Sequence, residues 1–205
     1  MARRIYGVLG LCLILFPILG LAGCTLTHDG DREHGSNDAA AELERLHNIG
    51  QRVEIIRDDF GVPHIYGKTD ADAVFGLLYA QAEDDFPRIE RNYIWAIGRL
   101  AEVEGESALY SDLRARLYMS IPEAKLAYER APDWLQALCR AFADGLNFYL
   151  ATHPDVSPRL LTRFEPWMPM FFFEGSIGGD IEQIPLAGIE AVYGGPTPQA
   201  VAAAP

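Results

Sequence analysis

The stretch from Val53 to Glu106 constrains the fold of this 205-residue chain more than any other part of the sequence. It opens with VEIIRDDFGVPHIYG, in which β-branched residues lie on both sides of the turn-forming run Asp58–Gly61. Such residues around a turn cluster are typical of a β-hairpin. Pro63 has no backbone N–H to donate, so we expect it at a sheet edge or beside a bend. The folded unit therefore begins with a short hairpin.

A long helix is predicted directly after the hairpin. Thr69 can cap its N-terminus, and Asp70 and Asp72 follow in the first turn, where the helix dipole favours negative charge. Apolar residues then recur at helical spacing, at Val74, Leu77, Leu78 and Ala82. Pro87 cannot donate the hydrogen bond of an interior helical residue. The helix should therefore end or kink there, and a second helical segment should run on towards Gly105.

Further helices are predicted in the second half of the chain. The strongest follows Pro132 and carries apolar residues three and four positions apart, at Leu135, Leu138, Phe142, Leu146 and Tyr149. Its internal Gly145 costs roughly 1 kcal/mol relative to alanine and permits close packing. Residues 113–119 and 122–131 are predicted to form shorter helices, and residues 181–193 the last one. The predicted fold class is α+β, mostly helical with an N-terminal β-hairpin.

The segments on either side of this unit differ from it in composition. Residues 24–50 are polar and rich in turn formers, which predicts a tether with at most a short helix at 39–47. Residues 195–205 are rich in Pro and Ala without periodicity, which is typical of a linker remnant. Residues 51–194 are therefore predicted to form one domain, and they are numerous enough for a sizeable core.

The first 23 residues are predicted to be an export signal. Arg3 and Arg4 precede an apolar run at 5–21, which ends in Leu21-Ala22-Gly23-Cys24. This pattern resembles a bacterial lipoprotein signal, so we expect cleavage before Cys24, lipidation of its sulfur, and attachment to a bacterial membrane facing the periplasm or the cell exterior. A plain membrane anchor is the alternative, but glycines and a proline interrupt a run that barely reaches the roughly 18–20 residues of a span. The arginine pair fits a twin-arginine signal poorly.

The charge of the chain excludes polyanions as natural partners. Cleavage before Cys24 removes two of the 17 basic residues and none of the 29 acidic ones, so the formal net charge changes from −12 to −14. The sequence also has no basic stripe and no glycine-rich phosphate loop. We therefore expect no nucleic-acid partner. After cleavage of the signal and lipidation of Cys24, Cys139 is the one cysteine that remains, so it has no disulfide partner. It lies in an apolar helix, and we expect its thiol to be buried and inert.

Two polar clusters suggest chemistry, and each has a simpler interpretation. The run Glu83-Asp84-Asp85, with Glu90 nearby, could bind a metal or supply paired acid and base, but such a run is more typical of a solvated helix end. Glu44 and His47 have the Glu-x-x-His spacing of di-iron helix bundles, yet such a site needs a second copy and two further glutamates. The sequence lacks that second copy, so structural roles are favoured.

His64 and the aromatic residues raise similar alternatives. A catalytic His64 would need a serine and a carboxylate, and Gly175-Ser176-Ile177-Gly178 lacks the order of a nucleophile elbow. A structural His64, hydrogen-bonded within the hairpin, is therefore favoured. Most aromatic residues are explained as core. Phe171, Phe172 and Phe173 are the exception, because three consecutive phenylalanines cannot all face one core from a helix.

Six blocks, in order and at similar spacing, carry a resemblance to a known family. They are Ile56-Arg57-Asp58, Gly61-Val62-Pro63-His64-Ile65-Tyr66, Tyr79-Ala80-Gln81-Ala82-Glu83-Asp84, Gly98-Arg99-Leu100-Ala101-Glu102, Ala143-Asp144-Gly145-Leu146-Asn147 and Phe164-Glu165-Pro166-Trp167. Together they resemble the α-chain portion of the penicillin acylase family. Several independent blocks are far more specific than one short motif.

The resemblance implies an N-terminal nucleophile hydrolase with an αββα fold, of which this chain supplies the helical α subunit. In that family a precursor cuts itself into α and β chains, and the new N-terminal serine of β attacks an amide while its own α-amine acts as base. The resemblance therefore assigns no catalytic residue to this chain. The Gly35-Ser36-Asn37 run imitates the processing junction, but it precedes the α-chain blocks, so we interpret it as a decoy. On its own this chain is expected to be inactive.

The resemblance also implies binding roles near the end of the domain. One α-chain carboxylate commonly completes a structural calcium site that is otherwise built by β, and Asp180 and Glu182 are both candidates because the alignment needs a gap there. Hard oxygen ligands suit calcium, but one carboxylate cannot hold it without β. Phe171, Phe172 and Phe173 lie just before this segment and are our candidates for the acyl pocket.

Two functions are consistent with these features. In the first, the chain is the lipid-anchored α subunit of an exported amidohydrolase, whose partner is the β chain of the same precursor. Its substrates would be small N-acylated compounds such as β-lactams or acyl-homoserine lactones. In the second, the chain is a truncated, catalytically inactive lipoprotein that acts as a helical binding or scaffold module.

Overall fold

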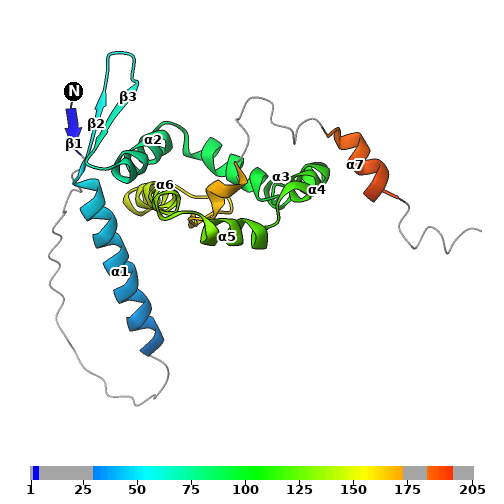
Figure 1. Ribbon diagram of the computed structural model, residues 1–205, viewed down its shortest axis with the longest axis horizontal. Coiled ribbons are helices and arrows are strands. Elements are labelled where there is room, and N and C mark those ends of the chain that lie inside the picture. Colours follow the sequence, from blue (N-terminus) through cyan, green and yellow to red (C-terminus); the bar gives the residue numbers. More distant parts are fainter. Residues whose placement is uncertain (1, 5–29, 173–183, 196–205) are drawn as a thin grey trace, which may run out of the picture.

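The computed structural model describes residues 2–4, 30–172 and 184–195, and most of these residues are helical (Figure 1). The strands are β1 (Ala2–Arg4), β2 (Val53–Arg57) and β3 (Pro63–Gly67). The helices are α1 (Gly30–Gly50), α2 (Asp70–Ala96), α3 (Ala101–Glu104), α4 (Leu109–Tyr118), α5 (Ile121–Arg130), α6 (Asp133–Thr152) and α7 (Leu186–Tyr193), with short 3-10 turns η1 (Glu106–Ala108) and η2 (Met168–Phe171).

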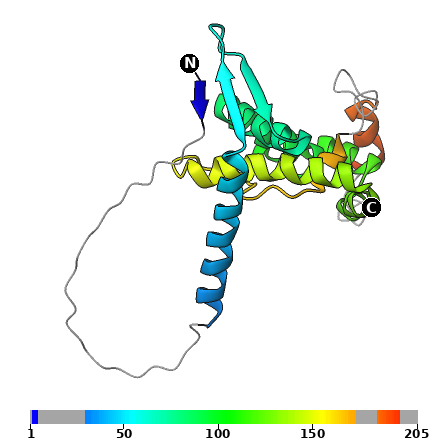
Figure 2. The same ribbon diagram turned by 60° about the vertical axis from the view of Figure 1, so that its left-hand side comes forward.

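The predicted hairpin is present. β2 pairs with β3 in antiparallel register, with Ile55 opposite Ile65, and β1 adds a third, antiparallel strand on the other side of β2. Pro63 lies on β3, which is an edge strand of this sheet, as predicted. Gly61 adopts a φ of +81° in the connecting turn, a conformation that glycine reaches without steric cost. The hairpin stands out from the helices, with α1 extending away from the same end of the molecule (Figures 1 and 2).

The core lies where α2 packs against α6 and the hairpin. Phe75, Leu146 and Phe148 are fully buried there. Gly145 allows the two helices to approach, because a Cβ at this position would clash with the backbone carbonyl of Phe75. On the opposite side of α2, a Cβ on Gly76 would lie within 2.8 Å of side-chain atoms of Val53 and Ile65. The absence of a side chain at two positions of the interface therefore brings α6, α2 and the sheet together.

Helix α2 is capped and kinked as the sequence predicts. The Thr69 hydroxyl accepts a hydrogen bond from the Asp72 N–H at 3.1 Å. Asp85 leaves the helical conformation with φ −160° and ψ 68°, two residues before Pro87. Its carboxylate then accepts a hydrogen bond from the N–H of Arg88, so Asp85 caps the second half of the helix.

The prediction of a polar tether over residues 24–50 was wrong where the structure describes these residues, because α1 is a helix packed on α6. Leu46 is 2% exposed, and the His47 ring lies edge-on to Phe148 at 5.0 Å. The guanidinium of Arg45 donates two hydrogen bonds of 2.7 Å to the Asp144 carboxylate. A narrow apolar stripe on an otherwise polar helix is a weak sequence signal, and the composition concealed it.

Two smaller predictions also need correction. The last helix was expected from residue 181, but α7 starts at Leu186 because Pro185 takes an extended conformation and forms its N-cap. Residues 181–183 lie outside the described ranges. Most aromatic residues were explained as core, and Trp134 is an exception because it is 65% exposed.

Candidate functional site

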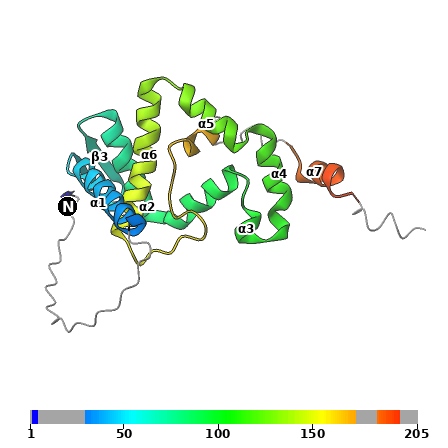
Figure 3. The ribbon, with the colours of Figure 1, turned by 90° about the horizontal axis from the view of Figure 1, so that it is seen from below.

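One buried and one half-buried polar side chain hold the segment that leads from α6 to η2. The Oε1 atom of Glu90 accepts hydrogen bonds from the N–H groups of Leu160 and Leu161, and Oε2 accepts one from the N–H of Arg159, at 2.8–3.0 Å. Glu90 is 2% exposed. The amide of Asn147 pairs with both backbone groups of Phe164, at 2.8 and 2.9 Å. Helices α2 and α6 therefore fix this segment together, and α2, α4, α5 and α6 surround it (Figure 3).

An aromatic cluster lies where this segment reaches η2. The ring of Tyr93 in α2 contacts three others edge-on: Phe142 at 5.9 Å, Phe164 at 5.3 Å and Phe172 at 5.1 Å. Tyr93 is 3% exposed, and its hydroxyl has no hydrogen-bond partner among the described residues. Burial raises the pKa of Tyr93 well above its ordinary value, so the phenol is neutral. The cluster is an apolar wall with one unsatisfied hydroxyl.

The structure places two of the three phenylalanines predicted to bind substrate. Phe171 is half-buried and lies edge-on to Trp167 at 6.1 Å, whereas Phe172 is 46% exposed and covers Tyr93. The two side chains thus have different environments, as expected for consecutive phenylalanines. Phe173 lies outside the described residues, and so do the predicted calcium ligands Asp180 and Glu182 and the predicted lipidation site Cys24. The roles of these residues stay predictions.

Cys139 lies beside this wall and has the structural role that its sequence context predicts. It is 5% exposed, and its thiol Sγ lies 4.0 Å from Met170 Sδ. Burial raises the pKa of the thiol, so it is protonated at neutral pH and is a poor nucleophile.

The acidic run in α2 belongs to the framework of the hairpin. One guanidinium nitrogen of Arg57 lies 2.8 Å from Asp84 and 3.3 Å from Glu83, and it also donates to the Ala80 carbonyl. Because Glu83 and Asp84 are exposed, this group corresponds to the solvated helix face favoured by the sequence. Glu90, by contrast, is a buried structural acceptor on the other side of the kink, so the four carboxylates do not act together.

The three histidines of residues 37–172 also make structural contacts. His64 Nε2 lies 3.2 Å from an Asp58 carboxylate oxygen within the hairpin, which confirms the predicted structural interpretation. His47, of the Glu44-x-x-His47 run, packs edge-on against Phe148 in the core, in line with the structural role favoured by the sequence. His153 stacks on Tyr149 at 4.2 Å, and its Nδ1 lies 2.9 Å from the Tyr149 carbonyl. Only an N–H can bond to that oxygen, so His153 Nδ1 is not free to take a proton from the neighbouring Thr152 hydroxyl.

The sequence reasoning missed the structural acceptors Glu90, Asn147 and Asp112. Asp112 is 5% exposed and accepts hydrogen bonds from the N–H groups of Leu100 and Ala101, at the start of α3. One signal was available for Glu90, which shares a buried stripe with Ile94 and Ile97, four and seven residues further on. A polar residue on an apolar stripe predicts a buried hydrogen-bonding role.

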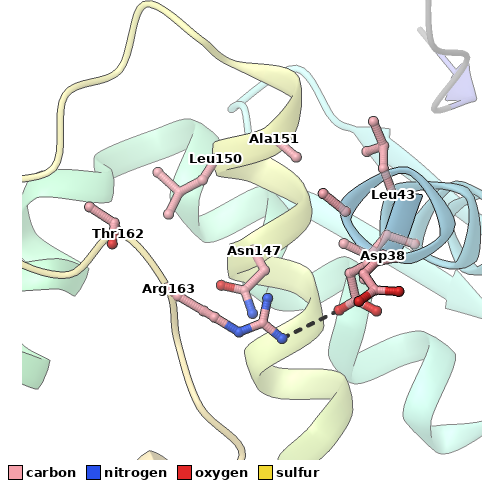
Figure 4. A pocket seen from close by; sticks show the side chains of 10 residues that line it. Asp38, Leu43, Asn147, Leu150, Ala151, Thr162 and Arg163 are labelled. Carbon is pink, nitrogen blue, oxygen red and sulfur yellow. Dashed lines mark ion pairs between the residues drawn. The ribbon is translucent and has the colours of Figure 1, made fainter. Parts of the chain in front are cut away.

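A separate groove of about 620 Å³ lies between α1, the second half of α6 and residues 162–163 (Figure 4). Leu43, Leu46 and Leu150 supply apolar lining, and Arg163 pairs with Glu42 across the groove at 3.5 Å. The Asn147 amide also lines it, but both of its polar atoms are already bonded to Phe164. Nothing in this lining selects a particular ligand.

Neither a metal centre nor a membrane span occurs within the described ranges. No three His, Cys, Asp or Glu side chains of residues 37–172 and 184–195 come together as ligands for a metal ion. Of the helices in residues 30–172 and 184–195, none has the length and apolar character to cross a membrane.

Comparison with solved structures identifies the class of fold. A thermostable penicillin G acylase from Alcaligenes faecalis matches with a TM-score of 0.56 and 20% sequence identity, over 68% of this chain and 79% of that chain. The prediction of a mostly helical, α+β chain of the N-terminal nucleophile hydrolase fold is thereby confirmed.

Sequence comparison gives the family. Residues 52–184 match the penicillin amidase family model, so the chain belongs to the penicillin amidase family, as its sequence blocks predicted. Acyl-homoserine lactone acylase QuiP of Pseudomonas aeruginosa is 34% identical over 156 residues, which cover 74% of this chain and 18% of QuiP. Penicillin acylase 2 proenzyme of Pseudomonas sp. strain SE83 is 30% identical over 120 residues, 57% of this chain and 16% of that protein. This chain spans less than a fifth of the length of these relatives.

Proposed function

We propose that this chain is the α subunit of an exported amidohydrolase that cleaves the amide bond of N-acylated compounds. The observation that carries the proposal is the family match over residues 52–184. The names of the relatives support an N-acyl substrate, since six that match are acyl-homoserine lactone acylases and others are penicillin acylases. We therefore propose acyl-homoserine lactones and β-lactams with an apolar acyl group as the substrates to test.

In this proposal the nucleophile and base lie on a β chain of the same precursor. The N-terminal serine of β attacks the amide carbon, and its α-amine takes the hydroxyl proton. A free α-amine has a pKa near 8, so part of it is unprotonated at neutral pH and can act as a base. Four side chains of this chain that could in principle act as base or nucleophile are already used in packing or local hydrogen bonds, which supports this division of labour. They are His47, His64, His153 and Cys139.

The α chain would contribute one wall of the acyl pocket. Phe172 is the described residue best suited to this role, because it is half exposed and its ring rests on the buried Tyr93. The Glu90 and Asn147 hydrogen bonds hold the backbone just before η2, so the wall is pre-formed before an acyl group arrives. Phe171 would support the wall from the side through its contact with Trp167. Phe173 stays a candidate for the acyl pocket from the sequence alone.

Calcium and the lipid anchor complete the proposal. Asp180 or Glu182 would supply one hard oxygen ligand to a structural calcium ion, and the β chain would supply the others. Cys24 would carry the lipid after cleavage of residues 1–23, which would attach the enzyme to a bacterial membrane facing the periplasm or the cell exterior.

An activity assay with two samples tests the proposal. The exported protein, as the cell processes it, and the isolated chain from Cys24 to Pro205 are each incubated with an N-acyl-homoserine lactone and with benzylpenicillin, and the released amine is measured. We expect amine release from the exported protein and none from the isolated chain. Failure of the exported protein to cleave either substrate would favour the inactive scaffold instead.

A further inference from the structure

The hydroxyl of Tyr93 is a buried polar group that this chain leaves without a partner. Tyr93 is 3% exposed, and its hydroxyl oxygen makes no hydrogen bond with any of the described residues. Nearly all buried polar groups in native proteins are paired, because an unpaired one has lost its water without gaining another bond. A phenylalanine would fill the same space without that cost. The packing of the core therefore does not account for the hydroxyl.

The groups around this hydroxyl are apolar or only weakly polar. Phe142 and Phe164 contact the Tyr93 ring edge-on. Burial is the larger cause of the raised pKa of Tyr93, and the nearby Cys139 adds to it. Cys139 in turn lies against the thioether of Met170, and neither sulfur is a strong hydrogen-bond acceptor. The hydroxyl is thus a neutral donor in surroundings that would penalise a charged ligand group through desolvation.

Phe172 covers part of Tyr93 and is itself open to solvent. Its ring lies edge-on to Tyr93 at 5.1 Å, and its side chain is 46% exposed. Phe172 follows the last residue of η2, so its backbone is no longer part of the 3-10 turn. A side chain exposed to this extent can change rotamer rapidly. An acyl group that packs on Phe172 from the open side therefore approaches Tyr93 with the end remote from its amide.

We infer that Tyr93 determines acyl specificity, its O–H donating a hydrogen bond to an uncharged oxygen at the far end of an aromatic acyl group; this rests on the proposed amidohydrolase with Phe172 in its pocket wall. Aromatic rings favour edge-on contact with further rings, so the wall suits an aryl group. A ring also holds its substituent at a fixed distance from the amide. The preferred substrates are therefore amides of ring-hydroxylated aryl acids, whereas a carboxylate at the same position is excluded by its desolvation cost.

A pair of amides that differ by one hydroxyl tests the inference in the exported, full-length protein. They are the 4-hydroxyphenylacetyl and phenylacetyl amides of the same amine, either homoserine lactone or 6-aminopenicillanic acid, and kcat/KM is measured for each. We expect wild type to favour the hydroxylated amide by about tenfold. Tyr93→Phe should lower this ratio to about one or less, because the substrate hydroxyl is then buried unpaired. Tyr149→Phe is the matched control and should keep the ratio, since Tyr149 is also buried but packs on Phe86 and His153.

The outcomes separate the role of Tyr93 from the proposed function. If wild type cleaves both amides without preference, or if Tyr93→Phe slows both equally, the inference is wrong and the amidohydrolase stands. If the exported protein releases no amine from either amide, the proposed function fails and the inference fails with it. A second measurement needs no variant: 4-hydroxyphenylacetate should inhibit wild type at about tenfold lower concentration than phenylacetate. Equal inhibition by the two acids would overturn the inference.

Discussion

Replacement of Glu90 measures how strongly the segment before η2 is held. Glu90→Ala removes the carboxylate that receives three backbone N–H groups, from Arg159, Leu160 and Leu161. Leu161 is 4% exposed, so its N–H would be left buried without a partner, whereas water can replace the acceptor at the exposed Arg159. One buried orphan donor and two weakened bonds cost roughly 2–4 kcal/mol of unfolding free energy.

Glu90→Gln separates the hydrogen bonds from the rest of the side chain. An amide keeps one acceptor oxygen, which can still receive the N–H groups of Leu160 and Leu161, but it turns an N–H₂ group towards the donor of Arg159. We therefore expect a smaller loss, roughly 1–2 kcal/mol. Glu129→Ala is the matched control, because Glu129 is exposed on α5, and it should change stability by less than about 0.5 kcal/mol.

Urea unfolding of the exported protein, followed by tryptophan fluorescence and circular dichroism, gives these free energies. The expected order of destabilisation is Glu90→Ala, then Glu90→Gln, then Glu129→Ala. If Glu90→Ala were as stable as Glu129→Ala, the three hydrogen bonds would contribute nothing to stability, and the claim that Glu90 fixes the segment before η2 would be refuted. Equal losses for the two Glu90 variants would show that the retained oxygen does not hold Leu160 and Leu161.

Three further predictions concern stability. Gly145→Ala should cost about 2 kcal/mol or more in thermal unfolding despite its helix propensity, because the new Cβ meets a backbone carbonyl of α2, whereas Gly188→Ala should be neutral or stabilising. Burial alone would raise the pKa of Asp72, but the ion pair with Arg52 at 2.6 Å lowers it on balance. The contribution of this ion pair to the unfolding free energy is therefore complete above about pH 4 and is lost as the pH falls below it. Asp72→Asn should make the loss of stability at acid pH less steep. Tyr93→Phe should keep or raise the melting temperature, and a loss above about 1 kcal/mol would show that its hydroxyl has a partner.

The sequence predicted the elements whose signals are local. The hairpin follows from the turn run at Asp58–Gly61, the start of α2 from Thr69, and its kink from Pro87, because each of these residues acts on the backbone next to it. The start of α7 was misplaced, since periodicity alone gave too little weight to Pro185.

The features that the sequence did not predict depend on contacts between distant residues. α1 is stabilised by packing on α6 and by the Arg45–Asp144 pair, 99 residues apart, so its own polar composition gave no warning. The role of Glu90 depends on backbone groups about 70 residues further on. Family membership was predictable because it rests on several short blocks, whereas the positions of the side chains around Phe172 required the folded structure.

The central claim is that this chain is one part of a two-chain hydrolase, and the composition of the exported protein tests it most directly. The protein is purified as its host makes it, and the intact mass and N-terminal sequence of every chain are determined. We predict two chains: this one, beginning at a lipid-modified Cys24, and a larger one that begins with serine and matches the penicillin amidase family. Recovery of this chain alone, without a larger partner, would contradict the claim.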